Sequence, residues 1–226
     1  MKRKHSSNLT NLIAFALIGA IAFVVQKFEF PIIPGVGFLK FDFSDVVITI
    51  GTFLFGAWAG VLITLIRTLC GLIFGGFALP TIVGQIAAFL ASLSFALPFY
   101  FLSKKVSEEN RHSLSNWLKP IFGLILGILM MTLVMALTNA FILTPVYALT
   151  SMAKIPAISS YQALYNFTVK NYLGGLLHLP SMQAYIFGII VPFNLLKGAV
   201  NSVVVYILFE ATLKNIKPFV QKKFNL

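Results

Sequence analysis

Long apolar runs with few charged residues are the feature that most constrains this chain. Five runs stand out in the sequence, at about 9–25, 46–77, 80–102, 120–146 and 185–213. A helix needs roughly 20 apolar residues to cross the hydrocarbon core of a bilayer, and every run is near that length or longer. The runs are continuous, whereas a transmembrane β-barrel alternates apolar and polar residues. The sequence therefore predicts an all-α integral membrane protein in which residues 1–226 form a single membrane domain.

The second apolar run is too long for one crossing. Its 32 residues would make a helix of about 48 Å, while the hydrocarbon core is about 30 Å thick. Gly51, Gly56 and Gly60 interrupt the run, so we predict two short helices that meet near Gly56. Six transmembrane helices follow, with predicted bounds of about 9–25, 45–57, 58–77, 80–102, 120–146 and 185–213.

The basic residues predict the topology. Eleven of the 17 Lys and Arg residues lie in three regions, 1–8, 103–119 and the segment after 213. Cytoplasmic loops of membrane proteins carry an excess of Lys and Arg. We therefore expect both termini in the cytoplasm, outer loops at 26–44 and 147–184, and a multi-pass location in the cell membrane. The net charge of +11 then reflects topology in the lipid bilayer, and no nucleic-acid partner is expected.

Motifs for catalysis are missing from the sequence. The three histidines are far apart without zinc-ligand spacing, and neither a phosphate-binding loop nor a Gly-x-Ser-x-Gly element occurs. We expect no enzyme activity, no catalytic residue and no metal site. An integral membrane enzyme stays as an alternative, with Asp42 and Asp45 as the close acid pair outside the basic loop.

Polar residues within the last apolar run indicate a binding site. Asn194, Lys197 and Asn201 are spaced i, i+3 and i+7, which places them on one helical face. Polar groups inside membrane helices are costly and usually functional. Amide and ammonium groups together suit a planar ring with carbonyls, and Asn139 lies at a similar depth in the preceding span. The alternative is that Lys197 extends toward the interface while the asparagines join helices.

The segment 38–45 connects the first outer loop to the second predicted span. Ser44 or Asp45 is expected to cap that helix, since either side chain can accept hydrogen bonds from its free N–H groups. Arg67, in the middle of the third span, needs a counter-charge, and Asp45 is a candidate partner.

Small residues on the first span predict a close helix contact. Ala16 and Ala20 form a small-xxx-small pair, a spacing that lets helices approach closely in lipid. The spacing leaves open whether this contact is internal or made with another protein.

The segments 38–45 and 51–60, with the Ala16/Ala20 pair and Asn194-x-x-Lys197, resemble the riboflavin-specific S components of energy-coupling factor (ECF) transporters. The resemblance implies the six-helix S-component fold and high-affinity capture of riboflavin outside the cell. Delivery inward would require a transmembrane coupling subunit and two ABC-type ATPases. Riboflavin would be the transported ligand, with no cofactor. An S component for thiamine, folate or pantothenate remains the alternative.

The resemblance also implies roles for particular residues. Hydrogen bonds to the polar edge of the isoalloxazine ring would come from Asn139, Asn194 and Lys197. Closure of the first loop over the ligand would involve Leu39, Lys40, Phe41 and Asp45. Docking of the coupling subunit would use Ala16 and Ala20.

Overall fold

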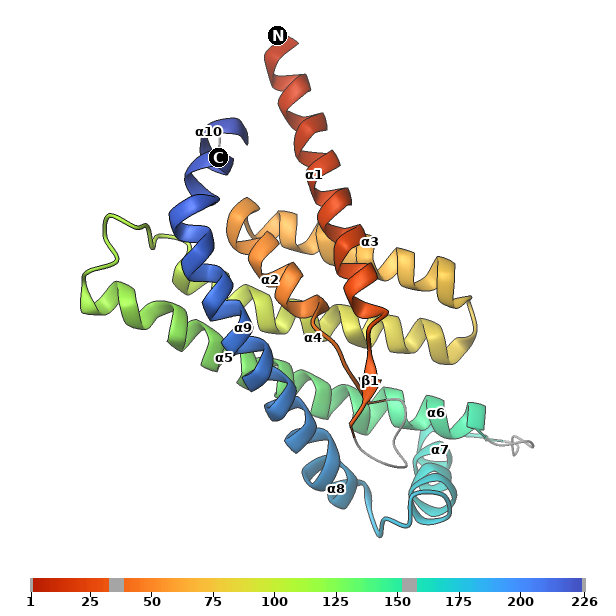
Figure 1. Cartoon of the computed structure of the whole chain (residues 1–226). Helices are drawn as coiled ribbons and strands as arrows, with labels where there is room; N and C mark the ends of the chain where they lie inside the picture. Colours follow the sequence, from red (N-terminus) through yellow and green to blue (C-terminus); the bar gives the residue numbers. More distant parts are fainter. Residues whose placement is uncertain (1, 33–38, 152–157, 225–226) are drawn as a thin grey trace.

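The computed structural model describes residues 2–32, 39–151 and 158–224, and these are almost entirely helical (Figure 1). Five of the described helical segments are long and apolar enough to cross a membrane, and a sixth apolar helix is shorter. The predicted all-α membrane class is therefore confirmed. The main helices are α1 (Lys2–Gln26), α2 (Ser44–Phe55), α3 (Ala57–Gly75), α4 (Leu79–Ser103), α5 (Leu114–Thr138) and α9 (Val191–Asn215).

The chain turns sharply between α2 and α3. Gly56 joins the two helices with a φ of +98°, a left-handed conformation that glycine adopts without a steric penalty from Cβ. This is the glycine near which the sequence predicted two short helices to meet. With 12 residues, α2 is about 18 Å long and cannot cross the hydrocarbon core alone.

Two spans contain π-helical turns at one end. Helix α5 continues through η1 (Asn139–Leu143) into α6 (Thr144–Ser151), and α8 (Met182–Tyr185) continues through η3 (Ile186–Ile190) into α9. Single π turns inside α-helices occur frequently at functional sites. Both turns lie in the part of each span that carries a predicted ligand asparagine.

The predicted outer loops contain regular structure. In the first, β1 (Phe30–Pro31) and β2 (Lys40–Phe41) form a short antiparallel hairpin. In the second, α7 (Tyr161–Phe167) continues into η2 (Thr168–Gly174). Phe38 of the first-loop motif and residues 152–157 of the second loop lie outside the described residues.

Glycines allow the closest helix contacts. A Cβ added to Gly127 of α5 would lie 2.5 Å from the carbonyl oxygen of Phe95 in α4, and one added to Gly198 of α9 would lie 2.9 Å from Ile128 in α5. A side chain at position 127 would require the backbones of α4 and α5 to separate, and one at position 198 would require the side chains of α5 to shift. The core that these contacts enclose consists of aromatic and aliphatic side chains such as Phe53, Phe95 and Phe209.

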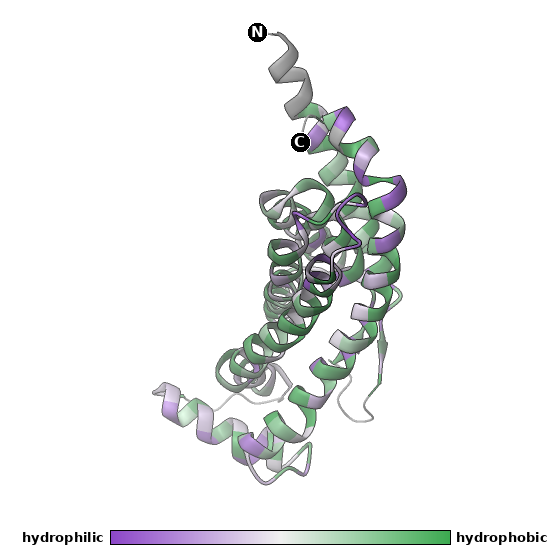
Figure 2. Cartoon of the chain, turned by 90° about the vertical axis from the view of Figure 1, so that its left-hand side faces the viewer, coloured by the Kyte–Doolittle hydropathy of each residue, from purple (hydrophilic) through white to green (hydrophobic). Residues whose placement is uncertain are grey.

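Both termini lie at one end of the molecule, and the hairpin, α7 and α8 lie at the other (Figure 1). Figure 2 shows hydrophobic residues along most of the long helices between these ends. That the terminal end faces the cytoplasm stays a prediction from the charge distribution.

The last described helix, α10 (Lys217–Phe224), packs against α9 and α1 at the end of the molecule where the termini lie. The ring of Phe224 meets Phe55 at the end of α2, with 5.2 Å between ring centroids. The Lys217 ammonium donates to the carbonyl oxygens of Lys104 and Val106, at 3.3 and 2.7 Å, just after α4 ends. A cation at this position also complements the negative end of the α4 dipole.

Candidate ligand site

Two acidic side chains and one lysine meet at the N-terminal end of α2. The Lys197 ammonium on α9 lies 2.9 Å from Asp42 Oδ2 and 3.1 Å from Asp45 Oδ2. Both carboxylates are buried, and the Lys197 side chain is 13% exposed. Lys197 therefore does not extend toward the interface but joins α9 to the start of α2. We call Asp42, Asp45, Lys197 and Arg67 the charge cluster.

Contrary to the sequence prediction, neither Ser44 nor Asp45 caps α2, and the residue before the helix, Phe43, makes no side-chain capping bond. Helix α2 begins at Ser44, which places both predicted caps inside the first turn, so that prediction is wrong. Asp42 Oδ1 instead accepts hydrogen bonds from the Ser44 backbone N–H, at 2.8 Å, and from the Ser44 hydroxyl. Burial raises the pKa of the Asp42 carboxyl, but Lys197 and the Ser44 hydrogen bonds outweigh burial and hold it below its usual value.

Asn201 supports the same two acids. Its Nδ2 donates to the Asp42 carbonyl oxygen at 3.5 Å and to Asp45 Oδ2 at 3.4 Å. Lys197 and Asn201, which the i, i+4 spacing places on one face, thus converge on the same pair of acids.

Arg67 joins the charge cluster through a serine. Its Nη2 donates to Ser92 Oγ on α4 at 3.0 Å, and Ser92 Oγ lies 2.5 Å from Asp45 Oδ1. Asp45 is therefore the counter-charge of Arg67, as the sequence suggested, but the hydrogen-bonded connection is indirect. The cluster ties together the first loop, α2, α3, α4 and α9.

Asn139 and Asn194 occupy equivalent settings in the two neighbouring spans. Both are buried, and the Nδ2 of each donates to the carbonyl four residues earlier, that of Met135 at 2.9 Å and that of Ile190 at 2.8 Å. This bond fixes the orientation of each amide. Among the described residues, neither side-chain oxygen accepts a hydrogen bond, so each amide keeps an acceptor and one N–H for a ligand.

The first-loop residues separate into two groups. Leu39 is buried against an apolar cluster of the outer end that includes Tyr172 and Tyr185, and Phe41 is buried between Phe30 and other loop side chains. Lys40 instead points to the surface, where its ammonium lies 2.5 Å from Glu29 across the hairpin. The structure thus brings Leu39, but not the Lys40 side chain, to the apolar region beside the asparagine-bearing spans.

Several residues of this region were missed at the sequence level. Ser92 lies in no motif, and nothing in the sequence singled out Tyr172 or Tyr185. Tyr185 is fully buried. Its burial could not be predicted from the sequence, because it results from the packing of α8 against η2.

Helix α1 presents its small residues in two directions. Gly19 and Ala22 face inward, and a Cβ on Gly19 would lie 2.8 Å from Ile66 of α3. Ala16 and Ala20 are exposed and lie among exposed apolar side chains such as Leu17. The pair that the sequence singled out therefore does not form the internal contact, which Gly19 makes instead.

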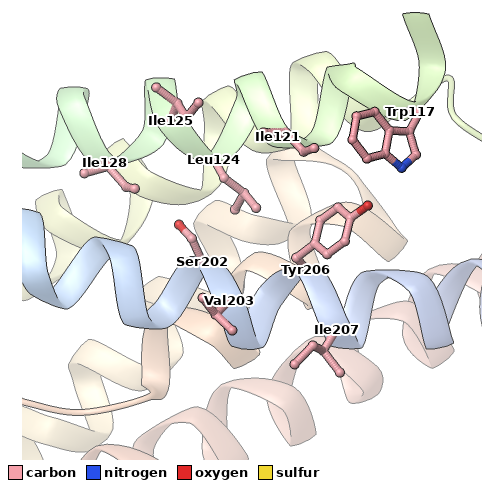
Figure 3. Close-up of a pocket in the computed structure, with 9 residues that line it drawn as sticks. All are labelled: Trp117, Ile121, Leu124, Ile125, Ile128, Ser202, Val203, Tyr206 and Ile207. Atoms are coloured by element: carbon pink, nitrogen blue, oxygen red, sulfur yellow. The ribbon is translucent and has the colours of Figure 1, made fainter. Parts of the chain in front are cut away.

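A groove lies between α5 and α9, and Figure 3 shows the side chains of both helices that line it. Its lining is apolar apart from Ser202 and the tyrosine hydroxyl, and it consists of Trp117, Ile121, Leu124, Ile125, Ile128, Ser202, Val203, Tyr206 and Ile207. At one end, Arg111 is already paired with Glu210. Such a surface fits lipid contact, and the convergent hydrogen-bonding groups lie elsewhere.

The apolar helices, with buried charged and amide side chains among them, define a polytopic integral membrane protein. Residues 10–209 match the model of the family described as ECF transporter, substrate-specific component, and the chain belongs to this family. Proteins of this family are transport components, which agrees with the expectation of no enzyme activity.

Individual relatives match over nearly the whole chain. The riboflavin transporter RibU of Leuconostoc mesenteroides is 32% identical, over 93% of this chain and 92% of that protein. The riboflavin transporter FmnP of Bacillus subtilis is 29% identical, over 94% of each. A solved structure described as the S component of a bacterial ECF transporter is 30% identical with a TM-score of 0.65, over 93% of this chain and 99% of that one.

Proposed function

We propose that this chain is the riboflavin-binding S component of an ECF transporter and takes the vitamin up from outside the cell. The observation that carries the proposal is that Asn139 and Asn194 are buried on helical segments that pack into one apolar cluster with Leu39. Lys197 lies one helical turn beyond Asn194. The names of the relatives, riboflavin transporters RibU and FmnP, support the choice of vitamin.

The chemistry of the site suits a flavin. The pyrimidine edge of an isoalloxazine ring carries carbonyl acceptors and an N–H donor, while its dimethylbenzene end is apolar. Each asparagine offers one acceptor and one N–H, and the Lys197 ammonium has three N–H groups, of which two point to carboxylates. A largely apolar site with a few convergent polar groups is the expected complement of such a ligand.

The partners in transport follow from the family and from the exposed face of α1. The chain contains no phosphate-binding loop, so energy must come from other subunits. We assign Ala16 and Ala20 to the surface that docks the transmembrane coupling subunit, which in turn would join two ABC-type ATPases. Small residues at an exposed position allow a partner helix to approach closely.

The test is a titration of the detergent-purified protein with riboflavin, followed by quenching of flavin fluorescence. Loss of one water-excluded hydrogen bond costs about 1–3 kcal/mol, so Asn194→Ala should weaken binding roughly 5- to 150-fold. Asn166→Ala is the matched control, because Asn166 is exposed on α7 and its one hydrogen bond within the described part of the chain is to Gln162. Wild-type protein that binds thiamine, folate or pantothenate but not riboflavin would refute the assignment of the ligand.

A further inference from the structure

The charge cluster is electrically neutral only when Arg67 is included. Asp42 and Asp45 carry two negative charges, and Lys197 supplies one positive charge next to them. Arg67, which is 1% exposed in the middle of α3, supplies the second. Ionised groups are costly in a membrane interior unless opposite charges compensate them.

We propose that Arg67, acting through Ser92, is a positioning residue that balances the charge of Asp45, so that the N–H of Lys197 that faces neither acid binds the ligand more strongly. This inference rests on the proposed function, because it assigns Lys197 a hydrogen bond to the bound vitamin. It adds Arg67, Ser92 and Asp42 to the residues that set the affinity of the site, although none of the three is proposed to touch the ligand.

The first step of the argument is the direction of the Ser92 hydrogen bond. A serine hydroxyl has a single proton, and the nearby acceptors are Asp45 Oδ1 at 2.5 Å and the Ala88 carbonyl oxygen at 2.8 Å. The carboxylate is closer and charged, so it receives the proton. The oxygen of the hydroxyl then accepts a hydrogen bond from the N–H of Arg67. Ser92 thus links the guanidinium of Arg67 to the carboxylate of Asp45 through two hydrogen bonds.

The second step is the number of donors on Lys197. An ammonium has three N–H groups, and here two point to Asp42 Oδ2 and Asp45 Oδ2. No third acceptor occurs among residues 2–32, 39–151 and 158–224. Without Arg67, two carboxylates would share one lysine in a buried cluster with a net charge of −1. The ammonium would then be held more strongly by its acids and would bind a carbonyl of the ligand less well.

A purely structural role for Arg67 makes a different prediction. If Arg67 serves only to join α3 to α4, its removal is harmful whatever happens to Asp45. If it serves to balance charge, neutralising Asp45 as well should restore the site. Arg67→Gln changes the cluster from 0 to −1, Asp45→Asn changes it to +1, and the double variant returns it to 0.

The experiment measures riboflavin affinity and thermal unfolding for Arg67→Gln, Asp45→Asn and the double variant in detergent. Each single change should weaken binding by at least about tenfold, and the double variant should bind within about threefold of the wild type. Arg111→Gln is the matched control, since Arg111 pairs with Glu210 at the other end of the molecule. It should leave affinity unchanged and should not rescue Asp45→Asn.

Ser92→Ala provides a second route if Arg67→Gln does not fold. Ser92→Ala keeps all four charges but removes the hydrogen-bonded link between Arg67 and Asp45, so it should weaken binding severalfold. Arg67→Lys keeps the positive charge and should bind riboflavin more tightly than any folded variant with a neutral residue at position 67. If the wild type binds riboflavin but the double variant binds it no more tightly than the weaker single variant, the proposed role of Arg67 is overturned and the proposed function stands. Wild-type protein that binds no riboflavin would overturn the proposed function as well.

Discussion

The opposite orientations of Gly19 and Ala20 allow a sharp test of the docking surface. We consider Gly19→Leu, which adds a side chain on the inner face of α1, and Ala16→Leu/Ala20→Leu, which enlarges only the exposed face. The same side chain is introduced in both cases, on the same helix and at adjacent depths. The two variants therefore separate contacts within the chain from contacts with a partner.

The structure sets the size of the effect at Gly19. A Cβ there would lie 2.8 Å from Ile66 Cβ and Cγ2 and 3.0 Å from the Ile63 carbonyl oxygen. Carbon atoms in contact are normally about 3.5–4.0 Å apart, so α1 and α3 must separate by about 1 Å. Overpacking of this kind costs about 1–3 kcal/mol, which lowers the unfolding midpoint by roughly 2–12 °C for a chain of this length.

The exposed positions should behave in the opposite way. Replacing Ala16 and Ala20 by leucine should change the unfolding midpoint by less than about 2 °C and leave riboflavin affinity intact, since exposed substitutions usually cost less than about 0.5 kcal/mol. Uptake of labelled riboflavin should nevertheless be lost in cells that supply the coupling subunit and the ATPases.

Two assays decide the matter: thermal unfolding of the purified variants, and uptake by whole cells. Full uptake with leucine at both Ala16 and Ala20 would refute the docking role. A lowered midpoint in that variant, with an unchanged midpoint for Gly19→Leu, would show that the two faces of α1 had been assigned the wrong way round.

Two further predictions distinguish the residues of the first loop. Leu39→Ala should lower riboflavin affinity by at least about tenfold and speed ligand release in stopped-flow fluorescence, because truncating a buried leucine costs about 2–5 kcal/mol and would loosen the loop. Unchanged release would mean that the loop does not cover the ligand. Lys40→Ala should change affinity by less than about threefold in the same titration, since exposed ion pairs such as Lys40–Glu29 contribute less than about 1 kcal/mol; a larger loss would place Lys40 at the ligand.

The apolar runs predicted the class of the protein and much of its span pattern. The last span, expected at 185–213, corresponds to helical residues 182–215. Helix α5 begins at Leu114, six residues before the expected start at 120, because its first turns are polar enough to escape a hydropathy argument. The π turns could not be predicted, since they change the hydrogen-bonding pattern by one residue without any mark in composition.

The site was predictable in part. The spacing of Lys197 and Asn201 correctly placed both on one face, but a helical period says nothing about what that face meets. Asp42 lies 155 residues away from Lys197 in sequence, and their contact depends on how the first loop enters α2. The hydrogen bonds that connect Arg67 to Asp45 pass through Ser92 of α4. They could not be predicted, because the sequence does not show that α4 packs with Ser92 between these two residues.

The position of α10 has a consequence for the chain after the last span. The turn at Gly56 ends a helix too short to cross the membrane alone, so its backbone must be covered by protein, and Phe224 packs against the adjoining Phe55. The segment after Asn215 therefore supplies a side chain that packs next to this turn. Asp45 lies in the first turn of α2 and Phe55 is its last residue, so a fusion or truncation that displaces α10 removes a packing contact from the helix that carries one acid of the charge cluster.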